Sequence, residues 1–359
     1  MAESSLKASL KLIAKVAIPI LIAAGVAWWQ FGSDFKNFDL STLRWSSRLT
    51  EGLIMALVLL FFREAGMAWR FRKLSDKKLS GGDSVRVSLI CDFTSAITPT
   101  SAGGSLLSMI FLHRRGLNIG QATAITILTL FLDMMFFVVT VPIIFLLISP
   151  SEILNFSAGK TDTNLAWVLM GIYLLVIFFS IILAVGIFYK PKAVGAFFLK
   201  IANYKLLRRF RGKAAELADG LNRTSYEIKQ YSWRWWIAPS LATIITWVAR
   251  MLLVNAIFFA FMPEANQPVI FGRQIIVTIL LMFVPTPGGS GVGEMLFKTY
   301  YADMINGPVI AIMAIIWRLF TSYIFLLTGI TVLPSFLKLY SSNQIKPNYR
   351  EENNRDQLG

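Results

Sequence analysis

The sequence has few of the residues from which soluble enzymes build their active sites. Its 359 residues include one cysteine, Cys91, and one histidine, His113. A single cysteine excludes an internal disulfide and a Cys-based metal site, and a single histidine leaves no His cluster that could bind zinc. Charged residues make up 15% of the chain, against roughly 25% in soluble domains. The composition therefore argues against a soluble enzyme or a DNA-binding protein.

Hydrophobic residues, by contrast, make up 55% of the chain and gather in long runs. Crossing a bilayer takes about 20 apolar residues, and six runs reach that length, at about 8–30, 48–69, 119–148, 164–189, 237–262 and 308–335. The first run follows three lysines and is either a cleaved signal peptide or an uncleaved span. We expect an uncleaved span, because the run continues into Trp28 and Trp29, which suit a membrane interface.

Two further apolar stretches, about 84–112 and 274–303, are interrupted by Pro and Gly. As a single helix, either would be roughly 44 Å long, too long for a hydrocarbon core of ~30 Å. Each therefore reads as two short helical arms that enter and leave the membrane on the same side. The fold class that we predict is an all-α polytopic membrane protein with six full spans and two such re-entrant hairpins.

The formal net charge of +15 is best explained by membrane orientation, because cytoplasmic loops of membrane proteins carry an excess of Lys and Arg. Segment 70–88, segment 190–234 with its eleven Lys and Arg, and the polar tail 339–359 are therefore expected in the cytoplasm. Two full spans between the first two segments bring the chain back to the side that it left, so the first hairpin begins and ends in the cytoplasm. In the second half, span 237–262 leaves the cytoplasm and span 308–335 returns to it, so the second hairpin begins and ends outside. This scheme counts Arg70 among the cytoplasmic charges and Arg273 among the external ones.

The two interruptions resemble each other. The first reads Thr98-Pro99-Thr100-Ser101-Ala102-Gly103-Gly104-Ser105, and the second reads Val284-Pro285-Thr286-Pro287-Gly288-Gly289-Ser290-Gly291. Each half reads as span, hairpin, span, over about 48–148 and about 237–338, and the halves enter the membrane from opposite sides. The pattern predicts an inverted-topology repeat, a design of secondary transporters, inside one membrane domain of residues 1–359.

Irregular backbone at membrane depth is tolerated only where it is buried in protein or lines a wet cavity. The two turns therefore predict a cavity, in which helix N-termini offer N–H groups to an anion. The glycines equally allow close packing of the hairpin arms. The turn residues that we expect to line the cavity are Thr100, Ser101, Gly103, Gly104, Pro285, Pro287, Gly288, Gly289 and Gly291.

Four ionisable residues lie at membrane depth in this scheme. Asp133, Arg250 and Arg318 are inside predicted spans, and Glu294 directly follows the second turn. Such residues are costly in a bilayer and usually face a cavity or a partner. One reading is two buried ion pairs that lock the repeats together. The other is a headgroup site, in which the arginines hold a phosphate and the carboxylates meet a cationic group or carry protons.

Other charged residues have plainer explanations. Arg63 and Glu64 are expected near the inner interface, where long side chains reach water. Asp92 begins the first hairpin and is read as a helix cap or a counter-charge. His113, beside two arginines, is read as an interfacial residue rather than a ligand.

The cytoplasmic linker 190–234 is basic and carries interleaved aromatic and leucine residues. This pattern is typical of a helix lying on an anionic lipid leaflet. RNA binding is the rival interpretation, but the flanking spans argue against it, and we expect no nucleic acid partner.

The string Pro285-Thr286-Pro287-Gly288-Gly289-Ser290-Gly291-Val292-Gly293-Glu294 resembles the flippase-like family related to the transmembrane region of lysylphosphatidylglycerol synthase, the multiple peptide resistance factor. The first turn with its Gly-Gly pair, Asp133, and Trp317-Arg318 with Gly329 are similar to the family pattern as well. The resemblance covers about residues 10–338. It implies an integral membrane protein that moves or accommodates lipids, with paired re-entrant hairpins around a headgroup cavity and aminoacylated phosphatidylglycerol as the best-known cargo.

One departure from that family concerns activity. Bifunctional members carry a soluble aminoacyl-transferase domain after the membrane region, whereas only the short tail 339–359 follows Lys338 here. Lipid synthesis by this chain is therefore not expected. The cargo is also left open, because relatives are linked to polyprenyl-phosphate-linked sugars and hopanoids.

We predict a lipid translocase that moves a phospholipid between leaflets, with Arg250 and Arg318 on the phosphate and Asp133 and Glu294 on positive charge or protons. No Gly-x4-Gly-Lys-Ser/Thr loop is present, so ATP hydrolysis is not expected. The prediction includes no enzymatic activity, no metal and no cofactor. It places the chain in the bacterial cytoplasmic membrane with both termini inside.

The expected partners are membrane phospholipid in the cavity and anionic lipid at the basic linker, and a homo-oligomer is left open. One alternative is a membrane enzyme or transporter acting on polyprenyl-phosphate-linked sugars or other lipid-linked substrates. In an enzyme, Asp133 and Glu294 would be the acid/base pair. Another alternative is a transporter of small solutes or ions.

Overall fold

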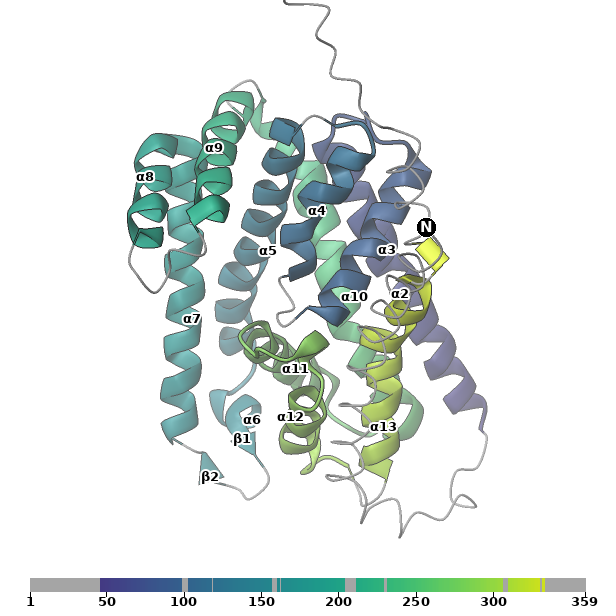
Figure 1. Cartoon of the computed structure of the whole chain (residues 1–359). Coiled ribbons are helices and arrows are strands. Elements are labelled where there is room, and N and C mark those ends of the chain that lie inside the picture. Colours follow the sequence, from purple (N-terminus) through teal and green to yellow (C-terminus); the bar gives the residue numbers. More distant parts are fainter. Residues whose placement is uncertain are drawn as a thin grey trace, which may run out of the picture.

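The computed structural model describes residues 46–98, 103–117, 119–156, 160–161, 163–203, 211–228, 231–305, 309–329 and 331–332 (Figure 1). The first predicted span, about 8–30, and the tail 339–359 lie outside these residues. Thr100 and Ser101 of the first turn lie outside them too.

The described chain is helical apart from two short antiparallel strands, β1 (Asn155–Phe156) and β2 (Lys160–Thr161). The helices up to the linker are α2 (Ser47–Leu74), α3 (Gly81–Ile97), α4 (Gly103–Arg114), α5 (Ile119–Leu147), α6 (Pro150–Leu154) and α7 (Thr163–Ala184) with the π-helical turn η2 (Val185–Tyr189). The others are α8 (Pro191–Ala202), α9 (Arg211–Ile228), η4 (Trp233–Trp236), α10 (Ile237–Phe261), α11 (Gln267–Met282), η5 (Pro287–Gly289), α12 (Val292–Tyr301), α13 (Val309–Arg318) and η6 (Leu319–Tyr323).

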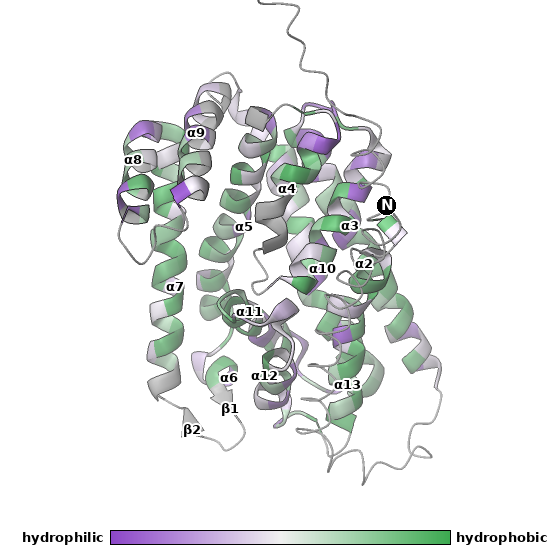
Figure 2. Cartoon of the chain, in the orientation of Figure 1, coloured by the Kyte–Doolittle hydropathy of each residue, from purple (hydrophilic) through white to green (hydrophobic). Residues whose placement is uncertain are grey.

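Within the described residues, five helices are long and apolar enough to cross a membrane: Ser47–Leu74, Gln121–Leu147, Ala166–Tyr189, Trp233–Phe261 and Val309–Gly329. They coincide with five of the six predicted spans. They carry exposed apolar side chains, such as Leu146 and Trp167. Figure 2 shows that the long helices are largely hydrophobic. Exposed apolar faces of this extent suit lipid rather than water, and the chain is a membrane protein.

Helices α2 and α10 pack closely against each other because small residues line their contact. A side chain at Gly52 would place its Cβ 2.5 Å from the Cβ of Ala260, and one at Gly66 would lie 2.6 Å from Thr246 Oγ1. Gly52, near the start of α2, contacts the end of α10, whereas Gly66, near the end of α2, contacts a residue closer to the start of α10. The two helices are therefore antiparallel. An inverted repeat requires this orientation, since α2 and α10 are the first spans of its two halves.

Two pairs of shorter helices fill the space between the long ones. Helices α3 and α4 form the first pair and α11 and α12 the second, and each pair is broken at its predicted Pro/Gly turn. The four helices have 17, 12, 16 and 10 residues. At 1.5 Å per residue they are about 26, 18, 24 and 15 Å long, each shorter than a hydrocarbon core of ~30 Å.

The broken ends of the two pairs meet. The backbone N–H of Gly288, in the second turn, donates a hydrogen bond to the carbonyl oxygen of Thr98, which caps the C-terminus of α3, at 3.3 Å. In Figure 1 the first pair occupies the upper half of the molecule and the second pair the lower half. The second turn therefore meets the C-terminal end of α3 between the two pairs.

The basic linker folds differently from the predicted surface helix. It forms two helices, α8 and α9, that pack on each other, with a Cβ at Gly195 placed 2.8 Å from the Cβ of Ala218. Helix α9 also packs on α5, where a Cβ at Gly220 would lie 2.1 Å from Thr123 Cγ2. Figure 1 shows both helices beside the upper ends of α5 and α7. Contact of the linker with anionic lipid stays a prediction.

Candidate functional site

A cavity of about 380 Å³ lies between the long helices, next to the junction of the two helix pairs. Its wall combines residues from α2, α3, α5, α7, α10, α11 and α13 with the second turn. The charged residues in this wall are Arg63, Arg70, Arg250, Arg318, Asp92 and Asp133. The sequence predicted a cavity at this place, and the structure brings Arg250, Arg318, Asp133, Gly288 and Gly289 together around it.

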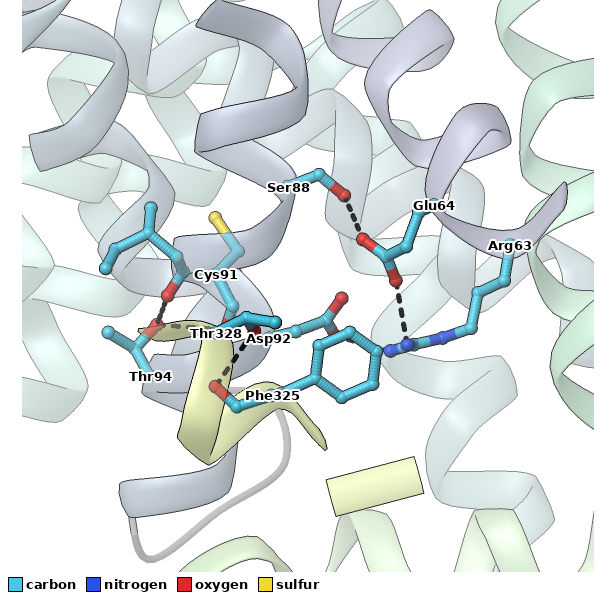
Figure 3. Close-up of polar contacts among 9 residues, drawn as sticks. Arg63, Glu64, Ser88, Cys91, Asp92, Thr94, Phe325 and Thr328 are labelled. Carbon is cyan, nitrogen blue, oxygen red and sulfur yellow. Dashed lines mark hydrogen bonds and ion pairs between the residues drawn. The ribbon is translucent and has the colours of Figure 1, made fainter. Parts of the chain in front are cut away.

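Arg63 is the centre of a buried ion cluster (Figure 3). Its Nη1 donates to Glu64 Oε1 at 2.8 Å, and its Nη2 donates to Asp92 Oδ1 at 2.5 Å. The Ser88 hydroxyl donates to the other oxygen of Glu64 at 2.8 Å, and the guanidinium carbon of Arg63 lies 4.3 Å from the ring centroid of Phe325. The prediction that Arg63 reaches interfacial water is wrong, because its neighbours bury its side chain in the bundle, whereas Glu64 is half-buried. Asp92 serves as a counter-charge, one of its two predicted roles.

Asp133 is held by two donors on different helices. Arg70 Nη1 donates to its Oδ1 at 2.5 Å, and the indole Nε1 of Trp247 donates to the same oxygen at 2.7 Å. Arg70 also donates to the Thr243 hydroxyl at 3.2 Å. Counting Arg70 among the cytoplasmic charges was wrong, because α2 continues to Leu74 and packs Arg70 against α5 and α10.

Arg318 and Glu294 form an ion pair that holds the second turn. Arg318 Nε donates to Glu294 Oε1 at 2.9 Å, and Arg318 Nη2 donates to the carbonyl oxygen of Gly288 at 3.1 Å. The other oxygen of Glu294 accepts the backbone N–H of Gly291 at 2.8 Å. Arg318 lines the cavity and Glu294 lies behind it. The contacts of this pair show a structural role, and headgroup binding by either residue stays a prediction.

The second turn depends on glycine conformations. Gly288, Gly289 and Gly291 have φ values of 58°, 69° and 84°. Residues other than glycine rarely adopt such positive φ values. Gly288 also has no room for a side chain, because a Cβ would lie 2.8 Å from the carbonyl oxygen of Ala96.

The remaining predicted turn residues take different places. Pro285, Pro287 and Gly291 belong to the same turn, outside the cavity wall, and Gly103 and Gly104 are the first residues of α4. The turn geometry therefore gives Gly288 and Gly289 direct contact with the cavity and leaves the other glycines and prolines to shape the backbone.

Arg250 differs from the other arginines of the cavity. Within the described part of the chain, Arg63, Arg70 and Arg318 each pair with a carboxylate, whereas Arg250 makes no ion pair and no hydrogen bond. Its guanidinium carbon lies 5.2 Å from the ring centroid of Trp247, and the side chain is half-buried. Arg250 is therefore a cation in the cavity wall that is free to meet an anion.

Sequence reasoning missed Arg63, Arg70 and Asp92 as cavity residues. A signal for the two arginines was present, because Arg63, Met67 and Arg70 follow an i, i+4, i+7 spacing that places them on one helix face. Arg70 was hidden because it stands at the border of a basic segment, where positive charge is explained by topology alone.

Arg273 was also misplaced by the sequence, as an external charge. Helix α11 begins at Gln267, behind an Asn266 cap, so Arg273 lies inside the helix and is buried. It binds both carboxylate oxygens of Asp303, at 2.6 and 2.8 Å, and donates to the carbonyl oxygens of Glu152 and Tyr300. These contacts fasten α6, α11 and α12 together, away from the cavity.

Comparison with known proteins agrees with this architecture. Residues 16–329 match the family described as the lysylphosphatidylglycerol synthase TM region. A UPF0104 membrane protein of Archaeoglobus fulgidus is 25% identical over 295 residues, which are 78% of this chain and 86% of that protein. No solved structure matches the chain. Because the family match covers most of the sequence, the chain belongs to the family of the lysylphosphatidylglycerol synthase TM region.

Proposed function

We propose that this protein moves a phospholipid between the leaflets of the membrane and binds the phosphate of its headgroup at Arg250. The observation that carries the proposal is the state of Arg250, a cation in the cavity wall without ion-pair or hydrogen-bond partner among the described residues. Membership of a family named for a lipid synthase's membrane region supports a lipid as the cargo.

A phosphate suits Arg250 for electrostatic reasons. A guanidinium group presents a planar fork of N–H donors that matches two phosphate oxygens. Asp92, Glu64 and Asp133 attract Arg250 from a distance, but none of them makes an ion pair with it among the described residues. A phosphate that enters the cavity would supply the direct partner that a half-buried cation favours. The other three arginines are already neutralised by carboxylates, which directs the phosphate to Arg250 rather than to them.

The cargo that we propose is phosphatidylglycerol, in particular its aminoacylated form. An aminoacyl group adds an ammonium, and the cavity wall offers an acceptor for it. Both donors to Asp133, Arg70 and Trp247, bind its Oδ1, so the Oδ2 of this wall carboxylate accepts no hydrogen bond from the described residues. Polyprenyl-phosphate carriers share the phosphate but lack the ammonium, so the two kinds of cargo are separable by experiment.

The two helix pairs would act as re-entrant hairpins and as gates. We place the α3 and α4 pair on the cytoplasmic side and the α11 and α12 pair on the outer side, with six spans and both termini inside. The hydrogen bond between Gly288 and Thr98 joins the two tips in the described state. Opening of either tip would then expose the cavity to one side of a bacterial cytoplasmic membrane.

Leaflet exchange in proteoliposomes tests the proposal. Purified protein is reconstituted with fluorescent phosphatidylglycerol, lysyl-phosphatidylglycerol, phosphatidylcholine or a polyprenyl phosphate, and the outer-leaflet label is quenched with dithionite. We expect Arg250→Gln to slow exchange by about tenfold or more, since a hydrogen bond to a charged group contributes about 1.5–3 kcal/mol.

The matched control is Arg86→Gln, which removes an exposed arginine outside the cavity wall and should leave exchange unchanged. If the wild-type protein exchanged none of the four lipids, the proposal that it is a lipid translocase would be refuted. Exchange that is indifferent to Arg250→Gln would overturn the assigned phosphate contact.

A further inference from the structure

The cavity wall has a polar side and an apolar side. Arginines and carboxylates from α2, α3, α10 and α13 form most of the polar side. On the other side, α7 contributes Leu175, Val176 and Phe179, and α5 contributes Leu130 and Met134 next to Asp133, which belongs to the polar side. The C-terminal end of α11 adds further apolar residues to this side.

Two residues of the wall are also exposed on the outer surface of the described structure. Leu175, on α7, is 49% exposed, and Phe283, at the C-terminal end of α11, is 45% exposed. The other wall residues are buried or half-buried. The cavity therefore opens to the surface beside α7 and beside the C-terminal end of α11, two helices that contact each other, and both exposed wall residues are apolar. Figure 2 shows that α7 is largely hydrophobic.

We infer that the acyl chains of a bound lipid leave the cavity sideways through this mouth between Leu175 and Phe283. The inference rests on the proposed function, because it names the path of the chains for a headgroup bound at Arg250. No charged residue lies at the mouth among the exposed wall residues, which suits hydrocarbon and not a water-filled opening.

Cavity size requires such an exit. A volume of about 380 Å³ is near the lower end of the ~300–1,000 Å³ range of small-molecule pockets, so it can enclose a headgroup but not two acyl chains as well. Transfer of each methylene group from hydrocarbon to a polar surrounding costs about 0.8 kcal/mol. The chains therefore stay in the bilayer while the headgroup occupies the polar side.

Photocrosslinking from neighbouring positions on α7 tests the mouth. Leu174 is a matched control for Leu175, because it is 56% exposed on the same helix and does not line the cavity. Leu175→Cys and Leu174→Cys are prepared in the full chain with Cys91→Ala, labelled with benzophenone maleimide and reconstituted with radiolabelled phosphatidylglycerol. Phe283→Cys and Met295→Cys form a second pair, since Met295 is exposed on α12 outside the cavity wall.

The decisive measurement is competition by water-soluble glycerophosphoglycerol, which carries the headgroup without chains. At Leu175→Cys and Phe283→Cys, we expect the competitor to lower lipid crosslinking to the level of bulk lipid. At Leu174→Cys and Met295→Cys, which contact bulk lipid only, crosslinking should not respond. If the competitor lowered crosslinking equally at the cavity positions and the control positions, the inference that the acyl chains leave through this mouth would be refuted.

Crosslinking reports where a chain lies and does not depend on transport. If exchange is present and crosslinking at the mouth is not competed, the translocase stands and this exit fails. If no exchange occurs but crosslinking at the mouth is competed, the binding path stands and the translocase fails. The two proposals can therefore be rejected separately.

Discussion

Arg318 and Arg250 lie in the wall of the same cavity, yet replacing each by methionine should affect the stability of the protein very differently. Arg318 is 2% exposed and pairs with Glu294, which is 1% exposed. Arg318→Met leaves that carboxylate buried without a counter-charge and releases the carbonyl oxygen of Gly288. Loss of one partner of a buried ion pair costs about 3–5 kcal/mol, a large part of the stability of an ordinary domain.

Arg250→Met removes no ion pair and no hydrogen bond within the described residues. It loses the contact with the Trp247 ring, which contributes about 0.5–2 kcal/mol. We therefore expect Arg250→Met to unfold close to the wild-type protein and Arg318→Met to be destabilised by several kcal/mol. Lipid exchange should be lost in Arg250→Met although the protein is folded.

Equilibrium unfolding in mixed detergent and dodecyl sulfate micelles, followed by tryptophan fluorescence, measures these differences. The double variant Glu294→Leu with Arg318→Met provides the internal control, because replacing both members of a buried pair by apolar residues is often close to neutral. It should recover much of the stability that Arg318→Met loses. Equal destabilisation by Arg250→Met and Arg318→Met would refute the distinction between a free and a structural arginine.

Three further substitutions test other parts of the structure. Gly66→Leu should separate α2 from α10, because even a Cβ would lie 2.6 Å from Thr246 Oγ1, and unfolding measurements should show a loss of about 1–3 kcal/mol. Gly288→Ala, at a φ of 58°, should lower leaflet exchange and stability together, the latter by about 1–3 kcal/mol, and an unchanged variant would show that the tip contact is dispensable. Arg273→Met should cost about 1.5–3 kcal/mol in unfolding by removing the hydrogen bonds of Arg273 to Asp303 and to the carbonyl oxygens of Glu152 and Tyr300, while phosphatidylglycerol binding to the folded fraction, measured by competition with glycerophosphoglycerol, should not change.

Much of the architecture could be predicted from the sequence because it depends on local properties of the chain. Five spans follow from the length of apolar runs, and the breaks after Ile97 and Met282 follow from clusters of Pro and Gly. A single Pro did not suffice, because Pro142 lies inside α5. Helix ends were less accurate. Helix α11 begins several residues before its predicted start because Asn266 caps it, and that difference moved Arg273 from the exterior into the protein.

The sequence by itself determined that the protein is a helical membrane protein with two broken helix pairs and charges at membrane depth. Only the tertiary structure decided how those charges combine. Asp133 binds Arg70, an arginine that the sequence predicted to lie in a cytoplasmic segment, and Arg318 binds Glu294 within the same half. An ion pair depends on the rotation and register of two packed helices to within a few ångströms, which spacing along one chain does not specify. Through those pairings Arg250 is left as the unpaired arginine of the cavity wall, among the described residues.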